Sequence, residues 1–261
     1  MINPIRDLTY RLYAANLERQ VLAAPLPRHI GLILDGNRRF ARANGLKDIS
    51  RGHKRGADKM DDVLAWAEEL GIETITAWIL SIDNLRRPPA ELMPLLEIIE
   101  QKIGELAEMQ KRMKRPRQIR GLGSLDLLPD SAREAIHLAE SATAGYGPYA
   151  LNLAVGYGGR EEITDAVKRL LLDEACAERS VKEIAAELRP ESIGRYLYTS
   201  EGAEPDLIIR TSGEVRLGGF MLWQSVYSEY YFCDVYWPAF RRIDFLRAIR
   251  SFQGRSSRRG R

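Results

Sequence analysis

Short apolar runs alternate along the chain with longer segments whose apolar residues recur every three or four positions. The short runs are typical of buried strands, and the longer segments are typical of amphipathic helices. Strands are predicted at residues 30–34, 73–80, 119–122, 150–155 and 207–209. Helices are predicted at 3–21, after Asn37, from 51 to the Gly71 cap, from 89 into a basic stretch, at 129–144 and within 161–195. This alternation predicts an α/β fold with a mainly parallel sheet covered on both faces.

A single domain is expected from residue 25 to residue 261, because no internal repeat or low-complexity linker divides the sequence. Residues 1–24 add an N-terminal helix in which Ile5, Leu8, Leu12 and Ala15 have helical spacing. Its arginines allow two interpretations, a helix that lies on a membrane surface or one that caps the domain. Packing against the domain is the favoured interpretation.

One stretch, residues 29–45, joins a predicted strand to a predicted helix through Asp35-Gly36-Asn37. An aspartate at the carboxyl end of a parallel strand faces the crevice where open α/β sheets bind ligands. The N–H groups of the following helix attract phosphate. A carboxylate such as Asp35 is a ligand for Mg²⁺, and Arg38 and Arg39 can each bind phosphate oxygens in pairs. The stretch therefore indicates a phosphorylated substrate with Mg²⁺, although Asp, Gly and Asn also favour simple turns.

Two other predicted strands end in loops of similar character, SIDNLRRP from Ser81 and RTSGE from Arg210. Parallel strands end at one edge of their sheet, so the three loops should lie together. Three coincidental turns of this composition are less plausible than one convergent site. The sequence therefore favours a ligand site over a simple turn.

Composition excludes few functions. With 45% hydrophobic and 29% charged residues the chain resembles an ordinary soluble protein, and a net charge of +3 does not by itself indicate nucleic acid. Basic residues cluster at 111–120 and from 241 to the end, which indicates either solvated faces or an anionic partner. Nucleic acid is disfavoured because residues 111–120 contain no aromatic side chain for stacking on bases.

Cysteine usage and hydropathy predict a cytoplasmic protein. Cys176 and Cys233 are far apart and lack the spacing of metal ligands. No apolar run approaches the roughly 20 residues that span a bilayer, and no apolar signal-peptide core lies near the N-terminus. Peripheral contact with a membrane stays open through the N-terminal helix.

Five motifs that occur in a fixed order along the chain resemble those of a known enzyme family. They are HxxxxxDGNxRxAxxxG, GHxxG, SxxNxxRP, NxAxxYGGR and RTSGExRxxxFxxWQxxYxE, between Arg28 and Trp237. Together they resemble the cis-prenyltransferases, the undecaprenyl diphosphate synthase-like enzymes. The sequence as a whole is most similar to those of short-chain actinobacterial members that make Z,E-farnesyl diphosphate. The DDxxD motif of trans-prenyltransferases is absent, since Asp61-Asp62 is followed by Val63-Leu64-Ala65.

The resemblance implies a Mg²⁺-dependent homodimer with an apolar substrate tunnel beside its sheet. Its reaction joins isopentenyl diphosphate to an allylic diphosphate, here geranyl diphosphate, and forms a cis double bond. Asp35 would organise Mg²⁺ and diphosphate, Asn84 would act at the reacting carbons, and Glu229 would be a second metal ligand. Asn84-assisted water, Asp35 or a substrate phosphate oxygen could each remove the proton. The resemblance assigns further substrate contacts to Gly36, Asn37, Arg38, Arg39, Phe40, His53, Ser81, Asp83, Leu85, Arg87, Arg210, Arg216 and Gly218.

Several positions depart from the family pattern and bear on substrate length. Phe40 and Leu85 replace tryptophans, Asp83 replaces glutamate and Gly218 replaces serine. A large residue, Ile79, stands where long-chain members have a small one, which favours a 15-carbon product over a long-chain polyprenyl diphosphate. Trp223 and Tyr227 are expected in the core or tunnel wall.

Two further expectations come from the same resemblance. Arg258 and Gly260 match a tail motif that reaches substrate across the dimer interface. A noncatalytic partner subunit is the alternative from another class. It is disfavoured because Asp35, Asn84 and Arg210 are all retained.

Overall fold

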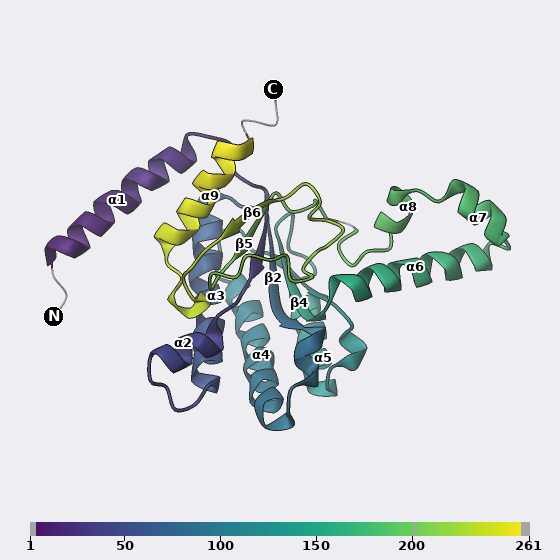
Figure 1. Ribbon diagram of the computed structural model, residues 1–261, viewed down its shortest axis with the longest axis horizontal. Coiled ribbons are helices and arrows are strands. Elements are labelled where there is room, and N and C mark those ends of the chain that lie inside the picture. Colours follow the sequence, from purple (N-terminus) through teal and green to yellow (C-terminus); the bar gives the residue numbers. More distant parts are fainter. Residues whose placement is uncertain (1–3, 201, 257–261) are drawn as a thin grey trace.

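Six parallel strands form one sheet at the centre of the computed structural model, which describes residues 4–200 and 202–256 (Figure 1). The order across the sheet is β3-β4-β2-β1-β5-β6, and every neighbouring pair is parallel. The strands are β1 (His29–Ile33), β2 (Thr74–Ser81), β3 (Gln118–Leu122), β4 (Ala150–Tyr157), β5 (Leu207–Arg210) and β6 (Glu229–Phe232). The predicted α/β class and parallel sheet are confirmed.

The helices agree with the predicted periodicity over most of the chain. They are α1 (Pro4–Leu22), α2 (Asn37–Ala43), α3 (Ser50–Leu70), α4 (Pro89–Gln110), α5 (Asp130–Thr143), α6 (Gly159–Cys176), α7 (Val181–Glu187), α8 (Pro190–Gly194) and α9 (Arg242–Ser256). Gly71 ends α3 in the left-handed conformation, at φ 73°, as its position predicted. Strand β6 and helix α9 were not predicted, and the polar loop after β2 contains a 3₁₀ helix, Ile82–Arg86.

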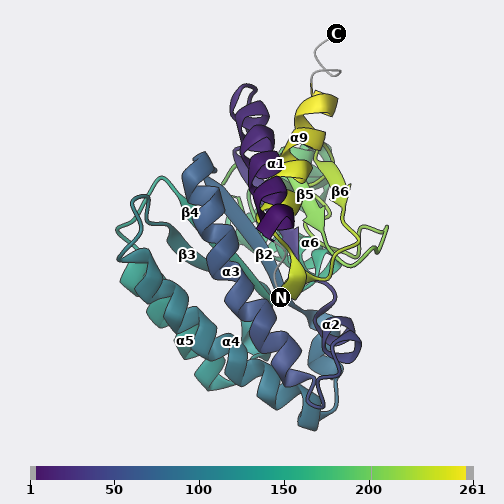
Figure 2. The ribbon, with the colours of Figure 1, turned by 90° about the vertical axis from the view of Figure 1, so that its left-hand side faces the viewer.

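Strand side chains alternate between two apolar layers of unequal size. Even-numbered residues of β1, such as Leu32, face a large core built with α3, α4, α5 and α9. Figure 2 shows α3, α4 and α5 lying side by side across this face of the sheet. On the opposite face Ile33 and Ile208 contact Phe220 and Met221, which belong to the segment between β5 and β6. The sheet therefore separates two apolar layers that differ in size and in the elements that build them.

Helix α1 packs on the domain through its C-terminal half. Leu17 and Val21 are buried, and the helix lies against α9. The face predicted from Leu12 is wrong, because that side chain is 64% exposed. No helix in the described part of the chain is long and apolar enough to cross a membrane.

Arginines of both basic clusters serve the fold. Arg117 is fully buried and donates hydrogen bonds to the carbonyl oxygens of Glu73 and Ile72, at 2.6 and 2.7 Å. Burial lowers the pKa of its guanidinium to about 10. In α9, Arg242 bridges Glu18 of α1, at 2.7 Å, and Glu69 of α3. These contacts explain part of each cluster without an anionic partner.

Candidate active site

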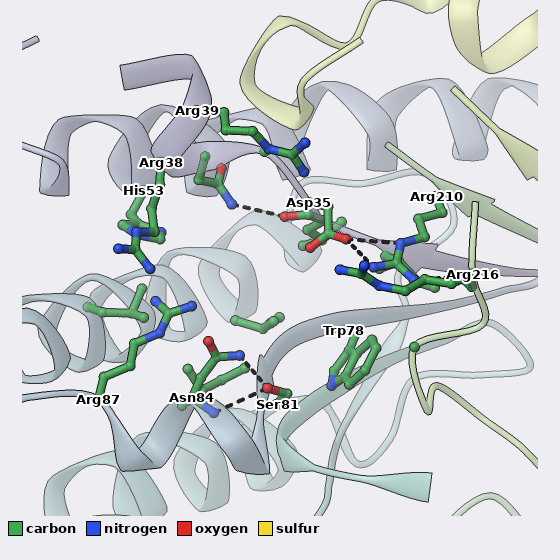
Figure 3. A pocket seen from close by; sticks show the side chains of 18 of the residues that line it. Asp35, Arg38, Arg39, His53, Trp78, Ser81, Asn84, Arg87, Arg210 and Arg216 are labelled. Atoms are coloured by element: carbon green, nitrogen blue, oxygen red, sulfur yellow. Dashed lines mark hydrogen bonds and ion pairs between the residues drawn. The ribbon is translucent and has the colours of Figure 1, made fainter. Parts of the chain in front are cut away.

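The loops that follow β1, β2 and β5 meet in one pocket of about 510 Å³ at the carboxyl edge of the sheet (Figure 3). The structure thus brings together most of the candidate residues from the sequence. The following candidates line the pocket: Asp35, Gly36, Asn37, Arg38, Arg39, His53, Ile79, Ser81, Asn84, Arg87, Arg210, Arg216 and Gly218.

Asp35 and Arg210 form the ion pair at the centre of the sheet edge. The register pairs Ile33 with Arg210, so the two side chains leave adjacent strand ends. The Nε and Nη2 atoms of Arg210 donate to Oδ2 of Asp35 at 3.0 and 2.7 Å. A third donor, Nη1, contacts the carbonyl oxygen of Arg216. Gly218 makes room for this guanidinium, because a Cβ there would lie 2.7 Å from Nη1.

The start of α2 is held by close backbone contacts. Gly36 has φ 103°, a conformation that favours glycine, and a Cβ there would lie 2.9 Å from side-chain atoms of Ser212 and Tyr236. Asn37 donates from Nδ2 to the carbonyl oxygen of Leu34 at 2.9 Å. Its Oδ1 atom is buried without a hydrogen-bond partner among the described residues. A Cβ on Gly56 would come within 2.1 Å of that atom, so the second glycine of GHxxG allows α3 to approach α2.

A second charged group lines the opposite side of the pocket, as Figure 3 shows for Arg38, His53 and Arg87. Glu91 in the first turn of α4 lies 3.1 Å from Arg87 and 3.4 Å from Arg38. His53 has no hydrogen-bond partner for its buried Nε2 atom among the described residues. Burial, followed by the positive charge of Arg87, lowers the pKa of His53 to about 4. The imidazole is therefore neutral near pH 7.

Glu214 fixes the arginines at the rim. Its carboxylate lies 3.1 Å from Arg39 and 3.0 Å from Arg216. Arg39 also donates to Oγ of Ser212 at 2.6 Å and lies over the ring of Tyr236 at 5.8 Å. Arg216 is 66% exposed, so it can move onto an incoming anion.

The 3₁₀ turn after β2 directs only some of its residues into the pocket. The backbone N–H and Nδ2 of Asn84 both donate to Oγ of Ser81. With about three residues per turn, the neighbours of Asn84 point elsewhere. Asp83 is 83% exposed and pairs with Arg86, while Leu85 packs against the large core. Phe40 is likewise buried in α2 and does not line the pocket.

Glu229 is not near Asp35 within one chain. It begins β6 and pairs in register with Leu207, at the amino end of the sheet, whereas Asp35 follows the carboxyl end of β1. Its carboxylate lies 3.4 Å from Arg255. The expected metal pair therefore does not form inside a single subunit. The tail residues Arg258 and Gly260 lie outside the described residues.

An apolar cavity of about 50 Å³ continues from the polar pocket into the space between α3 and α4. Ile79 and Leu95 line both spaces, and the inner end reaches Leu106 and Trp237. The odd-numbered residues of β2 face this side, which places Ile79 at the junction as its position suggested. The neighbouring Trp78 points to the other face and stacks on Phe220, with ring centroids 5.3 Å apart.

Two aromatic residues expected in the core or the tunnel wall lie elsewhere. Tyr227 is 74% exposed. Trp223 lines a separate small pocket together with Gln224 and with Gly194, Leu197, Thr199, Ser200, Gly202 and Glu204. The spacing of these residues in the motif does not predict where their side chains point, because the segment between β5 and β6 is irregular.

The sequence analysis missed three residues that line the pocket, Arg42, Trp78 and Leu95, and also Glu91, which pairs with the pocket arginines Arg87 and Arg38. Glu91 carried a usable signal, since it stands four residues after Arg87 at the start of a predicted helix. Opposite charges at this spacing pair on a helix surface. The sequence predicted Trp78 only as a residue of a buried strand and Leu95 only as a residue of the apolar face of a helix.

The carboxylates in the pocket suit a magnesium ion that arrives with its substrate. The described residues contain no group of three or more His, Cys, Asp or Glu side chains that could hold a metal alone. Mg²⁺ is commonly bound by one or two carboxylates together with substrate phosphates. Both hydrogen bonds from Arg210 reach Oδ2 of Asp35, so Oδ1 is the oxygen placed for such an ion.

Residues 33–260 match the sequence family described as "Putative undecaprenyl diphosphate synthase". The chain is 53% identical to an isoprenyl transferase of Deinococcus radiodurans, with 95% of this chain and 90% of that protein covered. It is 50% identical to the (2Z,6E)-farnesyl diphosphate synthase of Thermobifida fusca, with 98% of each covered. The structure of lavandulyl diphosphate synthase from Lavandula x intermedia in complex with dimethylallyl diphosphate is similar at a TM-score of 0.81 and 29% identity, covering 87% of this chain and 95% of that one.

Proposed function

The chain belongs to the undecaprenyl diphosphate synthase-like family of cis-prenyltransferases, and from this premise we propose that it condenses isopentenyl diphosphate with geranyl diphosphate to give (2Z,6E)-farnesyl diphosphate. The observation that carries the proposal is the adjacency of two spaces. A cationic pocket of about 510 Å³ opens into an apolar cavity of only about 50 Å³. The first space suits two diphosphates, and the second marks the apolar path along which a short hydrocarbon chain would extend.

The two cationic groups give each diphosphate its own place. The start of α2, with Asn37, Arg39 and His53, receives the allylic diphosphate, because helix N-termini and arginines bind phosphate. Arg210 and Arg216 receive isopentenyl diphosphate across the pocket (Figure 3). Ion pairs of Arg38, Arg39 and Arg210 with carboxylates order these donors before substrate binds.

The chemistry breaks the bond between the allylic carbon and its diphosphate oxygen. The terminal double bond of isopentenyl diphosphate then attacks that carbon, and the adjacent carbon loses a proton to an oxygen acceptor, for which a substrate phosphate oxygen, Asp35 and water held by Asn84 are the candidates. Arginine donors stabilise the charge that develops on the leaving diphosphate. Ser81 fixes the amide of Asn84 beside the region where the two carbons would meet.

Asp35 would hold Mg²⁺ through Oδ1 together with phosphate oxygens of substrate. The ion supplies charge neutralisation for the leaving diphosphate. Glu229 of the same chain is too far along the sheet to share that ion, as the strand register requires.

Two features support a short product over a long-chain one. Ile79 is bulky at the junction of the two spaces. A cavity of about 50 Å³ is also smaller than the roughly 150 Å³ cavity that accepts benzene in another protein.

The test is incubation of the purified protein with Mg²⁺, isopentenyl diphosphate and primers of five, ten or fifteen carbons, followed by product sizing and assignment of the new double bond. We expect a 15-carbon product with a new Z bond from the ten-carbon primer. Absence of any chain elongation would reject the proposed activity. Products of fifty carbons or more would instead assign a long-chain synthase.

We also infer a homodimer. Strand β6 is one of the two edge strands of the described sheet, and Val226 and Tyr227 just before it are 68% and 74% exposed. An edge strand next to exposed apolar side chains favours pairing with a second chain. Light scattering on the eluting protein should give twice the chain mass of 29.6 kDa, and Val226→Asp should halve it. A wild-type monomer at micromolar concentration would contradict the dimer.

A further inference from the structure

An ion pair between α3 and α4 borders the apolar cavity. Lys102 lies in the middle of α4, is only 7% exposed, and lines the cavity with Ile99 and Ile103. Its Nζ atom donates to Oδ2 of Asp61 on α3 at 2.7 Å. It also donates to Oε2 of Glu105, one turn further along α4, at 3.2 Å. One buried ammonium therefore has one partner on the opposite helix and one on its own.

The same two helices form the side walls of the cavity. Ala57 and Met60 of α3 face Ile98 and Ile99 of α4 across it. At about 50 Å³ the space is smaller than a benzene-sized cavity of roughly 150 Å³, so it must widen further with each five-carbon unit added to the chain. Close-packed walls absorb added volume only by moving. A longer chain must therefore separate α3 from α4.

The N-terminal part of α4, before the ion pair, has one backbone hydrogen bond fewer to hold it in place. Pro94 lies inside the helix and has no N–H to donate to the preceding turn. The segment before Pro94 carries Glu91, which pairs with Arg87 and Arg38 of the polar pocket. Lys102 follows Pro94 in α4, in the part of the helix that lines the apolar cavity. Its contact with Asp61 can therefore hold the middle of α4 against α3.

We propose that the Lys102–Asp61 ion pair sets the product length by holding α3 and α4 together around the growing hydrocarbon chain. This inference rests on the proposed function. Lys102 lies in the wall of the apolar cavity, and neither Lys102 nor Asp61 lines the polar pocket that would bind the diphosphates. Breaking the pair should therefore lengthen the product and leave the chemical step intact.

The structure offers a matched pair of variants. Asp61→Asn removes the charge that links the helices with almost no change in volume, and it leaves the contact of Lys102 with Glu105. Glu105→Gln removes the partner on the same helix and leaves the link to α3. Asp61 and Glu105 are 47% and 46% exposed, so desolvation does not distinguish them.

The experiment sizes the products of wild type, Asp61→Asn, Lys102→Met and Glu105→Gln with a ten-carbon primer and excess isopentenyl diphosphate. We expect Asp61→Asn and Lys102→Met to move most of the product from fifteen carbons to twenty or more, with first-addition rates within threefold of wild type. Glu105→Gln should retain the 15-carbon product.

Thermal melting shows whether each variant folds. A folded Asp61→Asn that makes the wild-type product, or that has lost the first addition, would overturn the inference. The same product shift in Glu105→Gln would also overturn it, because the link between helices is intact there. A wild-type protein that elongates no primer would instead reject the proposed function.

Discussion

Each arginine group in the pocket has its own carboxylate. Glu91 holds Arg38 and Arg87, Glu214 holds Arg39 and Arg216, and Asp35 holds Arg210. These ion pairs orient the guanidinium groups and limit their mutual repulsion. An incoming diphosphate competes with these carboxylates for charge-assisted hydrogen bonds.

His53 should make the free energy of unfolding depend on pH. Its folded pKa is about 4, below the usual value of 6.5. Between these values the unfolded chain binds a proton that the folded chain does not, so stability falls as pH falls. One such group contributes a slope of about 1.4 kcal/mol per pH unit within that window. His53→Gln should reduce the slope measured by urea unfolding from pH 7 to pH 4.5.

His137 provides the control because it lies exposed on α5, and His137→Gln should leave the slope unchanged. His29 will keep part of the slope in both variants, since burial also lowers its pKa. Equal slopes for wild type and His53→Gln would contradict the burial of a neutral imidazole.

Ile79→Ala should lengthen the product. The change removes three carbons from the junction of the polar pocket and the apolar cavity, where a growing chain must pass. Product sizing with the ten-carbon primer should show species longer than fifteen carbons. Ile75→Val is the strand-core control, since Ile75 is fully buried on the same strand but lines neither space. An unchanged 15-carbon product from Ile79→Ala would place the stopping point on α4.

Motif spacing located the strand-end residues but not the direction of every side chain. Asp35, Asn84 and Arg210 lie in one pocket because parallel strands end together. Asp83 shares the motif of Asn84 and points to solvent, since the 3₁₀ turn rotates successive side chains. Pairwise distances such as that from Glu91 to Arg38 depend on tertiary packing and could not be predicted.

At the scale of elements, the close packing of α3 against α2 leaves no room for one added methyl group at Gly56. Gly56→Ala would press a methyl group against Oδ1 of Asn37, 2.1 Å away, and shift the diphosphate site. We expect at least a tenfold rise in KM for the allylic diphosphate. Gly104→Ala is the matched control, because that helical glycine has open space around it, and it should stabilise the protein by about 0.5–1 kcal/mol. Wild-type KM for Gly56→Ala would contradict the tight packing.

Periodicity predicted most elements, and its two failures have physical causes. Strand β6 is four residues of Glu, Tyr, Tyr and Phe, all partly exposed, so it lacks the apolar run of a buried strand. Helix α9 carries arginines among its apolar residues, and its charge obscured the face formed by Phe245, Leu246 and Ile249. Salt bridges from α9 to α1 and α3 stabilise a segment that composition alone marked as a solvated end.

At the scale of the whole molecule, the proposed dimer assigns a role to the end of the chain. Arg258 and Gly260 lie outside the described residues, and their resemblance to a tail motif predicts a phosphate contact in the neighbouring subunit. Deleting residues 256–261 should raise KM for isopentenyl diphosphate and lower turnover. Light scattering should still report a dimer. Unchanged kinetics would remove the tail from the site.

The measurement that tests the central claim most directly is the turnover of Asp35→Ala at saturating Mg²⁺, beside Asp83→Ala. Both aspartates belong to strand-end motifs, but Asp35 pairs with Arg210 in the pocket and Asp83 is 83% exposed. We expect Asp35→Ala to lose more than 99% of turnover with its fold preserved by thermal melting, and Asp83→Ala to stay within threefold of wild type. More than a tenth of wild-type turnover in Asp35→Ala would contradict the assignment of this pocket as the site of prenyl transfer.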